Sequence, residues 1–195
     1  MSRMSASFFD QSSGNGRANV LTVAGIAIML LGAGAAALPF LDRQEGNQLV
    51  GWLLLSAGLI EIGAATQRFE NRILAMLAGA VTTAAGVLFL ANPMGHFLPA
   101  VTIITAWLLV RSLVLALTSS RAAGSVRVWL GISAATDFAL GMLMLGGLSI
   151  ATFIVMLFGP TPQLVASFAW VFAISFLVTG GLLLEIASCF RDNED

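Results

Sequence analysis

The sequence contains no lysine and no tyrosine, one cysteine and one histidine, and only 10% of its 195 residues are charged. Soluble proteins usually carry charges on about a quarter of their residues. The single cysteine, Cys189, excludes an internal disulfide and a cysteine metal cluster. A net charge of −1 offers no basic surface to nucleic acid, so we expect no nucleic-acid partner.

Motifs of catalysis are also missing. We find no HExxH helix, no phosphate-binding loop, no GxSxG turn and no paired histidine ligands. The glycine-rich stretch GAGAAA, residues 32–37, lies inside an apolar run with no strand before it. It therefore does not predict a nucleotide loop. We expect a protein that is not an enzyme, with no catalytic residue, no cofactor and no metal site.

What the sequence has instead is long apolar runs of about 20 residues, the length needed to cross a bilayer as a helix. The runs are continuous rather than alternating, which excludes a β-barrel. We predict an all-α polytopic protein with the lipid bilayer as its partner. Its six transmembrane helices are expected at roughly Asn19–Leu41, Gln48–Thr66, Arg72–Ala91, Phe97–Leu117, Val128–Phe158 and Gln163–Ala187.

The expected organisation is a flexible cytoplasmic tail over residues 1–18, a transmembrane domain over 19–188 and a short cytoplasmic tail over 189–195. The apolar run Val128–Phe158 is too short for two spans and long for one. We expect a long tilted or kinked helix there. The alternative is a break near Gly146-Gly147, with the following residues lying at the outer interface.

An internal repeat organises the first two thirds of the chain. Gly25, Gly32 and Pro39 recur as Gly79, Gly86 and Pro93 with one constant offset. Seven residues make nearly two helical turns, so each glycine pair lies on one helix face, and each proline marks a helix end. We expect three helical hairpins, pairing spans one with two, three with four and five with six.

The small-residue faces of this repeat are expected to be helix-packing seams, because close backbone approach drives helix association in lipid. A substrate path lined by small residues is the alternative. In the third hairpin the repeat is degenerate, since Phe138 stands where the second glycine is expected. The same faces would permit a homo-oligomer, and the sequence identifies no protein partner.

Arginines set the expected orientation, because basic residues concentrate on the cytoplasmic side. Arg43 falls on one side, and Arg111 lies within a span. The remaining seven fall together on the other side: Arg3, Arg17, Arg68, Arg72, Arg121, Arg127 and Arg191. Both termini are therefore expected in the cytoplasm.

Four ionisable residues lie inside the expected spans: Glu61, Arg111, Asp137 and Glu185. Such residues are costly in a membrane and usually face the bundle interior or water. We expect Arg111 to pair with Asp137, with Glu61, or with both, and Glu185 to reach the headgroups. The network either fixes the register of the helices or forms a proton- or ion-responsive site, and the sequence leaves both open.

The glycine repeat and the element GLIEIG, residues 58–63, resemble those of the HdeD family of bacterial inner-membrane proteins. The resemblance covers about Asn19–Ala187 and is weakest in the third hairpin. It implies six spans, a bacterial inner-membrane location and a role in acid or envelope stress, without catalytic or binding residues to carry over. The alternatives are a small proton-linked transporter or channel, and a structural or assembly protein.

Overall fold

The computed structural model is all-helical over the residues it describes, which are 3–36, 43–67, 71–91, 100–158 and 162–192. Side chains are described for 16–36, 48–67, 71–91, 100–146 and 170–191. The helices are α1 (Arg3–Ala36), α2 (Arg43–Thr66), α3 (Arg72–Ala91), α4 (Ala100–Arg121), α5 (Gly124–Phe158) and α6 (Pro162–Asp192). Within this described part, 6 helices are long and apolar enough to cross a membrane.

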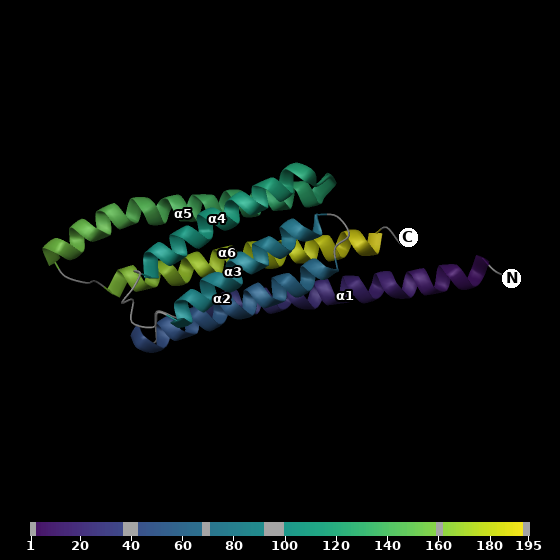
Figure 1. Cartoon of the computed structure of the whole chain (residues 1–195), viewed down its shortest axis with the longest axis horizontal. Coiled ribbons are helices and arrows are strands. Elements are labelled where there is room, and N and C mark those ends of the chain that lie inside the picture. The colour runs from purple at the N-terminus through teal and green to yellow at the C-terminus, as the bar shows by residue number, and fades with distance from the viewer. Residues whose placement is uncertain (1–2, 37–42, 68–70, 92–99, 159–161, 193–195) are drawn as a thin grey trace.

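The helices run side by side, up and down in turn, as Figure 1 shows. The start of α1 and the end of α6 lie at the same end of the bundle, which we call the terminus end (Figure 1). Each helix contacts the next one along the chain, and α6 contacts α1. The six helices therefore close into a ring in chain order.

The closest pairs in this ring are α1 with α6, α2 with α3, and α4 with α5. This differs from the expected hairpins, in which α1–α2, α3–α4 and α5–α6 would be the tight pairs. For α1/α6 and α2/α3, small residues explain the difference, because they lie where the backbones of these two pairs meet. A Cβ added to Gly25 of α1 would lie 2.9 Å from the carbonyl oxygen of Gly180 on α6.

The second glycine pair of the repeat, Gly79 and Gly86, allows α2 and α3 to approach each other closely. A Cβ on Gly79 would lie 3.0 Å from the carbonyl oxygen of Gly58, and one on Gly86 would lie 3.0 Å from that of Gly51. On α1, a Cβ on Gly32 would lie 3.2 Å from the Cβ of Phe176. All four repeated glycines therefore lie at close helix contacts.

Replacing Gly86 with alanine should destabilise the bundle by about 1–3 kcal/mol, the usual cost of overpacking. The new Cβ would lie 2.5 Å from the backbone nitrogen of Leu55, so the helices must separate. Thermal unfolding in detergent measures the loss. The control is Gly34→Ala, where a Cβ meets nothing within 4 Å and the helix gains up to about 1 kcal/mol. Equal stability of the two variants would contradict the packing described here.

Two residues with positive φ shape the connections at the terminus end. Asn71 has φ 53° just before α3, and Gly124 has φ 60° at the start of α5. Gly124 follows the two-residue link from α4, and glycine adopts this backbone conformation without steric cost. The short link keeps α4 and α5 side by side.

Three sequence expectations differ from the structure or concern residues outside the described part of the chain. Over residues 3–18, for which the sequence predicts a flexible tail, the structure has the first turns of α1; a helix extends readily from an existing one and the segment has no proline. The alternative break near Gly146-Gly147 is wrong, because α5 runs through both residues. Pro39 and Pro93 lie outside the described residues.

The outer surface of the bundle is apolar. Large side chains such as Val23, Leu30, Ile73, Leu113 and Leu143 are exposed. In water such a surface would be unfavourable, whereas lipid tails solvate it. Composition and surface together indicate a multi-pass membrane protein.

Candidate functional site

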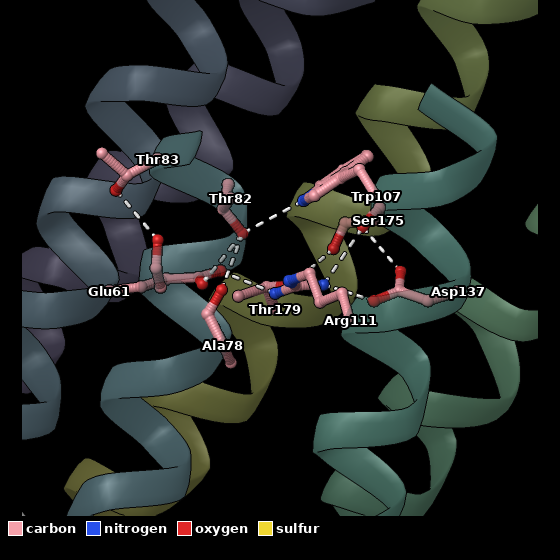
Figure 2. A network of polar contacts seen from close by, with 10 residues as sticks. Glu61, Ala78, Thr82, Thr83, Trp107, Arg111, Asp137, Ser175 and Thr179 are labelled. Carbon is pink, nitrogen blue, oxygen red and sulfur yellow. Dashed lines mark hydrogen bonds and ion pairs between the residues drawn. The ribbon is translucent and has the colours of Figure 1, made fainter. Parts of the chain in front are cut away.

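Arg111 lies at the centre of the ring, in the inner face of α4. That face places Ile104, Trp107, Leu108, Arg111 and Leu115 inside the bundle, at the spacing of one helical stripe. The guanidinium reaches away from α4, towards α2 on one side and α5 on the other (Figure 2). Arg111 therefore links α4 to its ring neighbour α5 and also to α2, which is not a neighbour of α4 in the ring.

The terminal nitrogens of Arg111 use all their donors. One is ion-paired with Asp137 Oδ2 and also lies 3.4 Å from Ser175 Oγ. The other donates to Glu61 Oε1 at 2.6 Å and to Thr179 Oγ1 at 2.8 Å. An arginine has five N–H donors, and the fifth, on Nε, has no partner in the described part of the chain.

The two carboxylates differ in how well their oxygens are satisfied. Asp137 Oδ2 forms the ion pair with Arg111, and Asp137 Oδ1 accepts a 2.7 Å hydrogen bond from Ser175 Oγ. Glu61 Oε1 accepts a hydrogen bond from Arg111, but the only donor to Oε2 among the described residues is Thr82 Oγ1, at 3.4 Å. That hydroxyl has a single proton and lies closer, at 3.1 Å, to the carbonyl oxygen of Ala78. Oε2 of Glu61 is therefore the least satisfied oxygen of the cluster.

The cluster is buried and its charges do not cancel. The exposed fraction is 1% for Arg111, 1% for Asp137 and 8% for Glu61. Two carboxylates and one guanidinium leave one negative charge in excess when all three are ionised. Isolated charges are expensive in a medium of low dielectric constant. One added proton makes the cluster neutral.

An aromatic layer covers the cluster on the side away from the terminus end. Trp107 lies one turn before Arg111 on α4, with the Arg111 Cζ 5.9 Å from its ring centroid. Its ring is 5.6 Å from that of Phe172 and 6.3 Å from that of Phe176, both on α6. The Trp107 Nε1 donates to Thr82 Oγ1 at 3.2 Å, which ties the layer to α3 (Figure 2). All three rings are buried.

A small cavity of about 30 Å³ lies against the cluster on its other side. Glu61 and Arg111 form one wall, and the rest comes from residues nearer the terminus end. These include Ala75 and Ala78 of α3, Thr118 of α4 and Leu130 of α5. A site of this size is large enough for one water molecule, given polar partners.

The structure brings Glu61, Arg111 and Asp137 into direct contact, so Arg111 has both of the partners between which the sequence left the choice open. Glu185 is partly buried near the end of α6 and makes no contact with the cluster among those described. Among the described residues, no three His, Cys, Asp or Glu side chains could hold a metal ion together.

Four polar partners were missed from the sequence: Thr82, Trp107, Ser175 and Thr179. Ser175 and Thr179 stand four residues apart in the otherwise apolar stretch 168–184, and this spacing places them on one helix face. That was an available signal. For Thr82 and Trp107 there was none, because threonines and tryptophans are common in spans for other reasons.

Comparison with known proteins adds no relative: no family model matches the chain, and no curated protein or solved structure matches it significantly. The class of protein thus follows from fold and site alone. It is a multi-pass helical membrane protein whose ring of helices encloses a buried Glu–Arg–Asp cluster.

Proposed function

We propose that this is a non-enzymatic protein of the bacterial inner membrane with a role in acid or envelope stress tolerance, and that the Glu61–Arg111–Asp137 cluster is its acid-responsive element. The observation that carries the proposal is that two buried carboxylates share one guanidinium. The arginine bias and the HdeD-like repeat support the cytoplasmic orientation and the stress role.

The charges of the three residues determine how the cluster responds to acid. With both carboxylates ionised, the cluster holds one excess negative charge away from water. One proton removes the excess, whereas a second would leave Arg111 without a counter-ion, which is unfavourable in a buried site. The cluster therefore takes up one proton on acidification. The proton weakens one of the two ion pairs that tie α4 to α2 and α5, and so alters the packing of the bundle.

Two other functions have some support. The cavity that touches Glu61 and Arg111 favours a small proton-linked transporter or channel. The ion pair that each carboxylate forms with Arg111 favours a purely structural or assembly protein, in which the cluster only fixes the helix register. Proton flux into liposomes containing the purified protein separates the first of these from our proposal, since an acid-responsive bundle without a conducting path gives no flux above empty liposomes.

The test of the proposal is survival of bacteria that produce the protein and are exposed to acid. Wild type should protect the cells, and Glu61→Gln and Asp137→Asn should both lose most of the protection, because each leaves a neutral pair with no excess charge. Glu185→Gln, which removes a carboxylate outside the cluster, should protect like wild type. Membrane levels of all variants are measured in parallel. Full protection by both cluster variants at equal levels would overturn the acid-responsive role.

A further inference from the structure

We propose that the proton reaches the cluster from the terminus end only, through a water molecule in the cavity beside Arg111, and that it binds to Oε2 of Glu61. This inference rests on the proposed function and adds the side of access and the receiving atom. Three independent features carry it: the place of the cavity, the unpartnered atoms beside it, and the aromatic layer opposite.

The cavity lies between the cluster and the terminus end. Its lining residues Ala75, Thr118 and Leu130 belong to the parts of α3, α4 and α5 that are nearest that end. The cavity volume of about 30 Å³ exceeds the roughly 10–15 Å³ that one water molecule needs. The cavity thus supplies a place for a water on one side of the cluster.

Two of the residues that line this place, Glu61 and Arg111, carry polar atoms in need of a partner. The Nε–H of Arg111 is buried and has no acceptor among the described residues. Glu61 Oε2 has only the long contact to Thr82. A water in the cavity accepts from the Arg111 Nε–H and donates to the Glu61 carboxylate, which satisfies both. A proton carried by this water passes to Oε2, and the water stays in place.

Asp137 is the less suitable receiver. Both of its oxygens already accept hydrogen bonds, from Arg111 and from Ser175, and it does not line the cavity. Among the described side chains that face Arg111, α2 supplies Glu61, α5 supplies Asp137, and α6 supplies only the hydroxyls of Ser175 and Thr179. α3 adds the hydroxyl of Thr82, which contacts Glu61.

On the opposite side the three buried rings of Trp107, Phe172 and Phe176 stand between the cluster and the other end of the bundle. They offer one polar hydrogen, the indole N–H, and Thr82 already accepts it. Water has no polar partner in such a layer and is excluded from it. Over the residues whose side chains are described, the two sides of the cluster are therefore unequal, and this favours proton entry from the terminus end.

The experiment is infrared difference spectroscopy on proteoliposomes with the protein in one orientation. The pH is lowered on one side only, and the band of a newly protonated buried carboxyl group is followed. Glutamate with an isotope-labelled side-chain carboxyl group should move this band, whereas labelled aspartate should not. Glu61→Gln should abolish the band, and Glu185→Gln should leave it unchanged.

Acid on the terminus side should produce the band, and acid on the opposite side should not. Ala78→Val, which fills the cavity, should slow its appearance by about tenfold or more because the water no longer fits. The control Thr105→Val alters a buried hydroxyl of α4 on the far side of Trp107 and should leave the rate unchanged. A band that appears equally from both sides, or that shifts with labelled aspartate, overturns the inference while keeping the proposed function. No band from either side refutes both, because the cluster then takes up no proton.

Discussion

Arg111→Met should destabilise the protein by about 3–5 kcal/mol, the usual cost of removing one partner from a buried ion pair. The substitution keeps an unbranched, shorter side chain and leaves Glu61 and Asp137 without a counter-ion. It also removes the hydrogen bond to Thr179. Thermal or denaturant unfolding in detergent at neutral pH measures the loss.

A triple variant shows that charge, not packing, causes this loss. Arg111→Met combined with Glu61→Gln and Asp137→Asn carries no charge in the cluster and should recover most of the lost stability, since buried ion clusters are often replaceable by neutral groups. Arg111→Met alone with the stability of wild type would contradict the cluster geometry. A triple variant as unstable as the single one would assign the loss to packing.

Arg111→Lys should cost about 2–3 kcal/mol despite keeping the charge. One terminal nitrogen of Arg111 serves Asp137 and the other serves Glu61, and a lysine ammonium is a single point that cannot reproduce this fork. Each hydrogen bond to a charged group contributes about 1.5–3 kcal/mol, and at least one is lost. Stability measured by unfolding in detergent checks this value.

The matched control is Arg191→Lys. Arg191 is exposed, and its contacts to Asn19 Oδ1 and Thr22 Oγ1 are long, 3.5 and 3.3 Å. Exposed polar contacts of this kind contribute at most about 1 kcal/mol, so this variant should be close to wild type. If Arg111→Lys lost as little stability as Arg191→Lys, the simultaneous ion pairs of the guanidinium with both carboxylates would be unnecessary for the fold.

The sequence predicts the helical class because apolar runs of bilayer length leave no other regular structure. It also marks where charges are expensive, and this is why Glu61, Arg111 and Asp137 stand out in the sequence alone. Their depths can be compared along straight helices. The partner of Arg111 cannot be chosen in this way, because it depends on which helices are neighbours.

The sequence alone could not predict which helices form the closest pairs in the ring. Chain connectivity suggests hairpins, whereas the closest pairs are α1/α6, α2/α3 and α4/α5. The pairs α1/α6 and α2/α3 depend on glycines of two helices facing each other, as Gly58 and Gly79 do. A single sequence gives the glycine stripe of each helix but not the helix it meets. The contacts of Ser175 and Thr179 with Arg111 follow from the same unknown.

Direct counting of protons tests the central claim, that the buried cluster takes up one proton. The purified wild-type protein is brought from neutral to mildly acidic pH while it stays folded, and the protons it absorbs are compared with those absorbed by Glu61→Gln and Asp137→Asn. Our account predicts that wild type absorbs one more proton per chain than either variant, because only wild type holds an excess buried charge. Identical uptake by all three proteins would contradict it and would leave the cluster as a fixed structural element.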